Sequence, residues 1–194
     1  MPRSLSGADT KKLIEEVWRE VKTSGEPIAS SRDPRFFNLR NVAALEILFA
    51  TGMRVGELVE LKLTDWCESE ASFVVNGKGS RQRIAFLPDV RSLKAVNSYM
   101  LHRTAISLND PAVFVNASGG KMTAQGIARM IVLTARKAAI SKRVTPHMML
   151  HTVATLLLRN GADIRVVQEI LGHASNRNHP EIHPRCERAH AVNS

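Results

Sequence analysis

Hydrophobic residues recur at helical spacing along most of this 194-residue chain, and the spacing changes only between Trp66 and Pro88. In that interval the pattern predicts two short strands, at residues 72–75 and 83–87, joined by the glycine-rich segment 76–80. A first helix is expected after Ser6, a second is expected to end near Gly52, and others are expected at residues 55–61, 89–105, 123–140, 145–160 and 163–171. The sequence therefore predicts a mainly α domain with one small antiparallel β-sheet (α+β) and a single core that ends at about residue 172.

Positive charge is in excess and unevenly placed. The chain has 27 Lys and Arg against 18 Asp and Glu, a formal net charge of +9. Residues 111–162 and 71–88 contain neither Asp nor Glu. Clustered positive charge is typical of a polyanion partner, with nucleic acid as the leading candidate, and a protein that is merely basic is the alternative.

Several function classes are excluded by what the sequence lacks. No apolar run approaches the length of a membrane span, and the first residues have no apolar signal-peptide core, so we expect a cytoplasmic protein without a membrane partner. Cys67 and Cys186 have no metal-type spacing, so neither a disulfide scaffold nor a cysteine zinc site is expected.

Arg54 stands at the predicted bend between two helices, between Gly52 and Gly56. Glycines allow a ligand to approach the backbone, and a fork-shaped, permanently charged guanidinium suits a phosphate. The alternative is a structural ion pair with Glu46 or Glu57.

Lys78 occupies the predicted hairpin tip and is followed by Arg81 and Arg83. A hairpin tip can enter a groove, and a desolvated lysine can donate a proton to a leaving oxygen. The alternative is an ordinary solvated turn.

Two histidine motifs complete the set of candidates. His147 and His151 lie one turn apart at the start of a predicted helix, but Met148 replaces the glutamate of the zinc-protease pattern, so no metal is expected there. His173 follows Gly172 at the end of another helix. The alternatives are a histidine pair on a core helix and a simple helix cap.

In order and spacing, these motifs resemble the catalytic domain of the tyrosine recombinase (phage integrase) family; they lie within TGMRVGELVELKLTDW, NGKGSRQRIAFLP and TPHMMLHTVATLLLRNGADIRVVQEILGH. The resemblance covers nearly all of residues 4–173 and implies that family's fold over residues 1–173. It implies double-stranded DNA and other recombinase protomers as partners, no cofactor, and a bacterial or phage-type, nucleoid-associated protein. Family members also carry an N-terminal domain that clasps DNA, which this chain is expected to lack.

The family breaks and rejoins DNA through a tyrosine that attacks a phosphodiester and leaves a 3′-phosphotyrosine. By resemblance, Arg54 is the first arginine of the phosphate site, and Lys78 is the lysine that protonates the leaving oxygen. His147 matches the first residue of the family's His-x-x-Arg, and His173 matches the later histidine. The residues expected to contact DNA are Lys78, Arg81, Arg83, Lys121, Lys142 and Arg143.

Two positions depart from the catalytic pattern. Leu150 stands where His-x-x-Arg requires its arginine, and Ile182 stands where the nucleophilic tyrosine belongs. The only tyrosine, Tyr99, falls in the predicted helix after the hairpin and matches no catalytic position. Because the covalent step needs that tyrosine, we expect a recombinase-like DNA-binding domain that does not cleave DNA.

Two other functions remain open. One is a non-catalytic DNA-binding subunit that interferes with an intact recombinase. The other is a partly active subunit that receives a tyrosine from a neighbouring protomer, against which Leu150 argues because the phosphate pocket would still lack an arginine.

Residues 174–194 have no helical or strand period and contain Pro180 and Pro184, so this tail is expected to be disordered. Residues 178–186 have a possible coding sequence that, shifted by one nucleotide, encodes Thr-Thr-Arg-Lys-Tyr-Thr-His-Val, which resembles the family's tyrosine segment. We therefore hypothesise a one-base insertion between codons 174 and 178, which the gene sequence tests directly.

Overall fold

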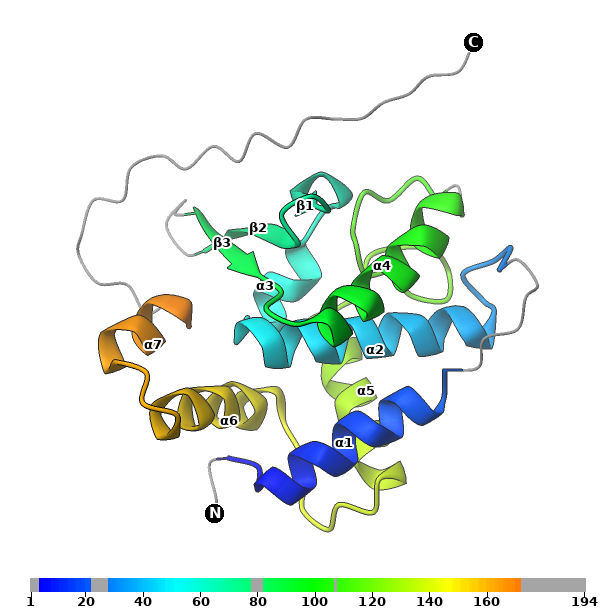
Figure 1. Cartoon of the computed structure of the whole chain (residues 1–194). Helices are drawn as coiled ribbons and strands as arrows, with labels where there is room; N and C mark the ends of the chain where they lie inside the picture. Colours follow the sequence, from blue (N-terminus) through cyan, green and yellow to red (C-terminus); the bar gives the residue numbers. More distant parts are fainter. Residues whose placement is uncertain (1–3, 22–27, 78–81, 107, 172–194) are drawn as a thin grey trace.

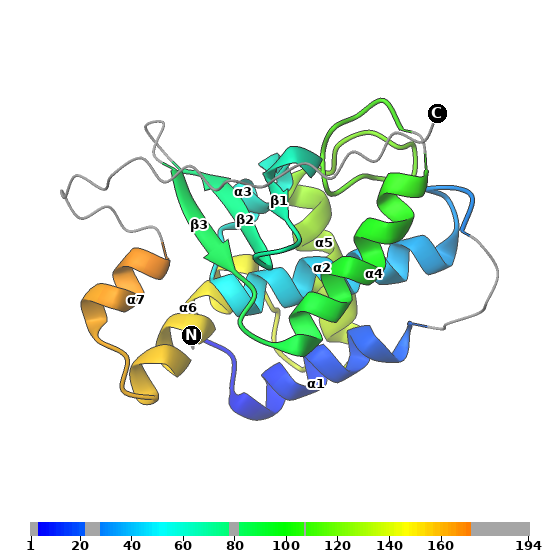
Figure 2. The same ribbon diagram turned by 45° about the horizontal axis from the view of Figure 1, so that its top comes forward.

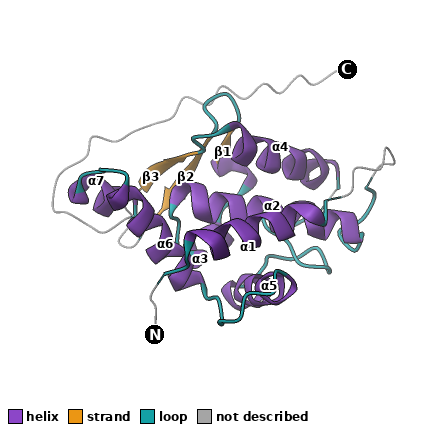
Figure 3. Ribbon diagram, turned by 60° about the horizontal axis from the view of Figure 1, so that its bottom comes forward, coloured by secondary structure: helices purple, strands orange, loops and turns teal. Residues whose placement is uncertain are grey.

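The computed structural model describes residues 4–21, 28–77, 82–106 and 108–171 (Figure 1). Its helices and strands follow in the order α1 (Gly7–Arg19), α2 (Pro34–Thr51), α3 (Val55–Glu60), the 3-10 helix η1 (Leu63–Asp65), β1 (Trp66–Cys67), β2 (Ser72–Asn76), β3 (Gln82–Phe86), α4 (Val90–Ala105), α5 (Ala124–Lys137), α6 (Pro146–Arg159) and α7 (Ile164–Ile170). Helices dominate, with one small sheet, so the predicted fold class is confirmed (Figure 3).

Local capping sets most of the helix boundaries. Ser6, Asp33, Asp89, Thr123 and Thr145 each accept a backbone N–H with the side chain just before a helix begins. Such caps are read from short stretches of sequence, which is why the helix starts agree closely with the prediction.

One helix end and one strand differ from the prediction. α5 ends at Lys137, three residues early, and Ala139 takes a positive φ of 52°. β1 was not predicted, because its two residues are too short to show an alternating pattern.

α2 is the central helix of the domain. It contacts α1, α4, α5 and α6, and the views agree that it runs between α4 on one side and α1 and α5 on the other (Figures 1 and 3). A helix covered from several sides must be apolar around most of its circumference. Its buried residues are Phe36, Val42, Ala43, Ala44, Leu45, Glu46, Ile47, Leu48 and Thr51.

The three strands form an antiparallel sheet in the order β1-β2-β3. Val75 of β2 pairs with Arg83 of β3, and directly paired residues project from the same face of a sheet. Val75 is fully buried, so Arg83 projects from the covered face of the hairpin. β2 contacts α3 and β3 contacts α2, which places this face against the α2–α3 region.

The remaining expectations concern segments between helices and the chain ends. Between α4 and α5, isolated bridges join Lys62 to Ala112 and Val115 to Lys121. In the described part of the chain, no helix is long and apolar enough to cross a membrane. The tail at residues 174–194 lies outside the described residues.

Candidate functional site

The bend between α2 and α3 is formed by a left-handed residue. Gly52 caps α2 with φ +60°, and its N–H donates to the carbonyl of Leu48 at 3.2 Å. Thr51 Oγ1 then accepts the N–H of Met53 at 3.2 Å. Arg54 follows as the extended N-cap of α3, so the bend projects its side chain from the end of the central helix.

Three elements meet at this bend. A Cβ at Gly52 would lie 2.5 Å from Leu171 Cδ2 and 3.4 Å from Val153 Cγ1. Val153 belongs to α6, and Leu171 directly follows α7. Packing therefore brings the end of α2, the middle of α6 and the residue after α7 to one place. Glycine is favoured at position 52 because of its left-handed φ, and a larger residue would also require the end of the Leu171 side chain to move.

Glu57 connects two arginines at this place. Arg54 Nη1 donates to Glu57 Oε1 at 3.2 Å, and the Arg54 backbone N–H donates to Oε2 at 2.9 Å. From β3, Arg83 donates to both carboxylate oxygens, at 3.1 Å to Oε1 and 2.9 Å to Oε2. The pairing of Arg54 with Glu57, one of the two alternatives considered for Arg54, is thus present, with Arg83 as an additional partner.

These contacts change the titration of Glu57. Burial acts to raise the pKa of its carboxyl, but the hydrogen bonds from Arg83 and from the Arg54 backbone outweigh burial and lower the pKa below its ordinary value. Glu57 is therefore a stable anion at neutral pH, with a side chain only 11% exposed. Arg54 is 41% exposed and Arg83 is 19% exposed, so Arg54 is the more accessible of the two cations.

The start of α6 carries the predicted histidine motif. Thr145 Oγ1 accepts the Met148 N–H at 3.3 Å, and Pro146 opens the helix. His147 is exposed and Leu150 is half-buried one turn later. No group of three potential metal ligands occurs among the described residues.

In Figures 1 and 2, α6 and α7 lie at the left of the molecule, and β3 is the strand that lies nearest to that side. Two of the predicted DNA contacts, Lys78 and Arg81, belong to the hairpin segment 78–81, which lies outside the described residues. His173 and Ile182, near the end of the chain, also lie outside the described residues. The described residue nearest to His173 in sequence is Leu171, which packs on Gly52.

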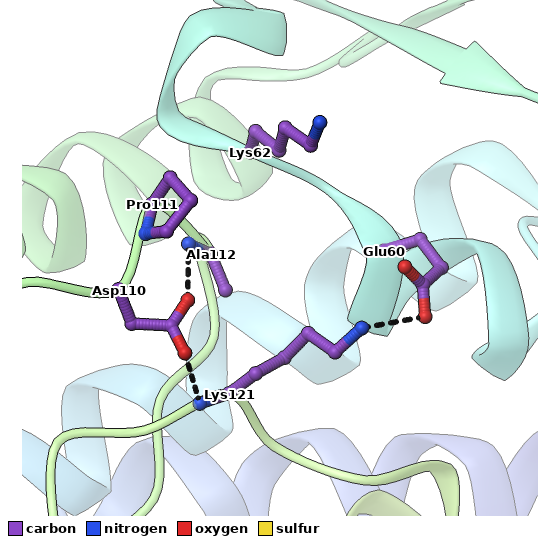
Figure 4. A pocket seen from close by; sticks show the side chains of 6 residues that line it. All are labelled: Glu60, Lys62, Asp110, Pro111, Ala112 and Lys121. Atoms are coloured by element: carbon purple, nitrogen blue, oxygen red, sulfur yellow. Dashed lines mark hydrogen bonds and ion pairs between the residues drawn. The ribbon is translucent and has the colours of Figure 1, made fainter.

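The other predicted DNA contacts lie elsewhere. Lys121 pairs with Glu60 at 2.8 Å, at the opposite end of α3 from Arg54, beside a shallow pocket lined by Glu60, Lys62, Asp110, Pro111, Ala112 and Lys121 (Figure 4). Lys142 pairs with Asp9 of α1 at 2.8 Å, and Arg143 is exposed. Of the predicted phosphate-binding and DNA-contacting cations that the structure describes, only Arg54 and Arg83 bind the same residue, Glu57.

Tyr99 is part of the core. It is fully buried, its ring centroid lies 5.3 Å from that of Phe36 and 5.5 Å from that of Phe114, and its hydroxyl donates to the Val113 carbonyl at 2.8 Å. Burial raises the pKa of its hydroxyl. The role of Tyr99 is therefore structural, in agreement with its mismatch to any catalytic position.

Sequence reasoning missed one functional relationship, that of Glu57 with Arg83. The sequence pattern indicates Glu57 only as a local partner for Arg54, and Arg83 only as a DNA contact. The two residues are 26 positions apart, and no local pattern in the sequence indicates that they meet.

Known proteins show where this fold and these motifs recur. A model of the Phage integrase family matches residues 28–179. Tyrosine recombinase XerD of Mycobacterium leprae is 37% identical over 181 residues, which cover 90% of this chain and 54% of that protein. XerD of Halalkalibacterium halodurans is 44% identical over 146 residues, which cover 74% of this chain and 48% of that protein.

Solved structures agree with these sequence matches. The crystal structure of XerA recombinase matches with a TM-score of 0.76 and 35% identity, over 90% of this chain and 57% of that one. The lambda integrase catalytic core shares the fold, with a TM-score of 0.60 at 14% identity, over 91% of this chain and 94% of that one. This chain spans about half the length of the curated relatives it matches. On the motifs, the fold and these matches together, the chain belongs to the phage integrase family of tyrosine recombinases.

Proposed function

We propose that this chain binds duplex DNA through its phosphate backbone at the Arg54 site and does not form the covalent protein–DNA link of its family. The first half follows from charge and geometry. Arg54 presents a partly exposed guanidinium two residues after Gly52, the position that packs against Val153 of α6 and Leu171, in a chain of net charge +9. A guanidinium in such a place is well suited to bind a phosphodiester through paired N–H donors.

Relatives of the same fold support DNA as the partner. The XerH site-specific recombinase has been solved bound to its difH substrate before cleavage, and it matches this chain with a TM-score of 0.73. By resemblance, His147, Lys78 and His173 complete the phosphate site around Arg54. Arg81, Lys121, Lys142 and Arg143 are the further cations proposed to face DNA, and other recombinase protomers are proposed as partners on the same DNA.

The proposal that no covalent protein–DNA link forms rests on the burial of Tyr99. It is the only tyrosine in the sequence, and its hydroxyl is enclosed in the core and bonded to a carbonyl. An attacking oxygen must reach the phosphorus in line, so a hydroxyl in this position supplies no nucleophile. Leu150, at the position of the second arginine, also removes a donor that would stabilise the charge on the phosphoryl oxygens, a loss that typically costs about 10²–10³ in rate.

Two measurements on the full chain test the proposal. Binding to duplex DNA is titrated against salt, and a suicide DNA substrate is used to trap any covalent adduct. We expect log K to fall steeply with log salt and no adduct to form. A binding constant that does not change with salt would contradict the phosphate site, and an adduct would contradict the loss of cleavage.

Arg54→Ala and Arg32→Ala form a matched pair for the same titration. Both remove one cation, but Arg32 is exposed just ahead of α2, at the far end of that helix from Arg54. We expect Arg54→Ala to weaken binding by about tenfold and to reduce the salt slope by about one, whereas Arg32→Ala changes little. Equal effects of the two variants would show that only general positive charge matters.

A further inference from the structure

We propose that Arg83 is a positioning residue that neutralises Glu57, so that this anion does not repel a phosphate at Arg54, and that Arg83 is not itself a direct DNA contact. This inference rests on the proposed function. It concerns the contacts of Glu57 with Arg83 and with Arg54, and it reassigns a residue that the sequence places among the DNA contacts.

The hydrogen bonds show that Arg83 is the main side-chain partner of Glu57. Arg83 engages both carboxylate oxygens, at 3.1 and 2.9 Å, in the fork-on-fork geometry that makes such pairs strong. The Arg54 guanidinium donates to Oε1 at 3.2 Å. With the Arg54 backbone N–H at 2.9 Å, four hydrogen bonds reach Glu57, which is about the acceptor capacity of a carboxylate.

The charge balance gives this geometry a consequence. Arg54 and Glu57 alone would sum to zero, and a phosphate approaching Arg54 would meet a buried anion beside it. Arg83 brings the sum of the three side chains to +1. Because Glu57 is only 11% exposed, solvent screens its charge poorly, so the neutralising cation must be a neighbouring side chain.

Placement argues against direct contact of Arg83 with DNA. Its side chain is 19% exposed, less than half the exposure of Arg54, and it projects from the same sheet face as the buried Val75. Turning outward to a phosphate would break both bonds to Glu57 and leave a largely buried carboxylate without its main partner, which is costly.

The same pair joins the hairpin to the phosphate site. Arg83 belongs to β3 and Glu57 to α3, so the ion pair ties the strand that leads out of the Lys78 hairpin to the helix that begins at Arg54. Loss of Arg83 is therefore expected to alter the position of Arg54 as well as the local charge.

A double-mutant cycle distinguishes neutralisation from direct contact. DNA affinity is measured for the native chain, Arg83→Ala, Glu57→Gln and the double variant. We expect Arg83→Ala to weaken binding by about tenfold in the native background and by less than about twofold in the Glu57→Gln background. An equal loss in both backgrounds would overturn the inference, because a direct phosphate contact does not depend on the charge of Glu57.

Arg83→Gln and Arg83→Lys separate charge from packing. Glutamine keeps polar bulk without charge and should weaken binding as alanine does, whereas lysine keeps the charge and should remain within about threefold of the native affinity. Native-like binding by Arg83→Gln would overturn the inference. Thermal unfolding of each variant confirms that the compared proteins are folded.

The matched control is Arg35→Ala. Arg35 also makes a forked pair with a carboxylate, Asp33, but at the start of α2, about 24 Å along the helix from the Arg54 end. We expect Arg35→Ala to leave DNA affinity unchanged. If the native chain shows no salt-dependent DNA binding, the proposed function fails. If the native chain binds DNA and Arg54→Ala weakens that binding, but Arg83→Ala costs as much affinity in the Glu57→Gln background as in the native one, only this inference fails.

Discussion

Leu171 packs directly over Gly52, so closely that a Cβ on Gly52 would lie 2.5 Å from Leu171 Cδ2. This contact joins the end of the central helix α2 to the segment that follows α7. It also sets the distance between Arg54, two residues after Gly52, and the C-terminal part of the domain. The bend that carries Arg54 therefore includes a left-handed residue in close contact with the Leu171 side chain.

Gly52→Ala should destabilise the fold. The substitution adds a Cβ to a left-handed residue at φ +60° and also requires the end of the Leu171 side chain to shift, so we expect a loss of about 1–2 kcal/mol in the free energy of unfolding. Gly56→Ala is the control, because Gly56 is helical with nothing within 4 Å of its Cβ position, and it should be neutral or stabilising. Urea unfolding of both variants checks this, and equal effects would contradict it.

Tyr99→Phe should lower stability without affecting DNA binding. It removes the hydroxyl that bonds the buried Val113 carbonyl, and an unsatisfied buried acceptor costs about 1–3 kcal/mol. Thr155→Val is the matched control, since its hydroxyl also donates to a carbonyl, that of His151, but at an exposed site. A loss of DNA affinity for Tyr99→Phe in folded protein would argue against a purely structural role.

Glu46 should make the fold sensitive to pH. Its side chain is 2% exposed, and burial raises the pKa of its carboxyl from 4.5 despite hydrogen bonds from Trp18 and Arg91. A raised pKa means that the folded state binds the proton more tightly than the unfolded state, so stability falls as the pH rises from about 4.5 through the folded pKa.

Glu46→Gln isolates this effect. The free energy of unfolding is compared between the variant and the native chain at about pH 4 and about pH 7, so that other groups cancel. We expect the free energy of unfolding of the variant, relative to that of the native chain, to be higher at about pH 7 than at about pH 4. A shift in favour of the native chain would mean that the ion pair with Arg91 outweighs burial.

Restoring the two catalytic positions should restore covalent chemistry. Leu150→Arg combined with the frame-corrected tail, which supplies a tyrosine in place of Ile182, is expected to form a trapped adduct on the suicide substrate. The corrected tail alone should give far less adduct, and Leu150→Arg alone should give none because the chain then still lacks the nucleophilic tyrosine. Leu156→Arg with the same tail is the control, because Leu156 is an exposed leucine of the same helix; an adduct of equal yield would show that position 150 is not the arginine position.

Much of the fold could be predicted because its signals are local. Caps such as Asp33 and Thr145, the left-handed stop at Gly52 and the glycine-rich hairpin are each contained within a few residues. β1 could not be predicted because two residues are too few to show an alternating pattern.

By itself, the sequence determined the alternation of helices and strands, the family motifs around Arg54 and His147, and the absence of both an arginine at position 150 and a tyrosine at position 182. Only the tertiary structure decided that Glu57 binds Arg83, that Tyr99 is enclosed in the core and that Leu171 covers Gly52. The physical reason is range: propensities and caps act over a few residues, whereas burial and ion pairing between distant segments arise only when the whole chain packs around α2.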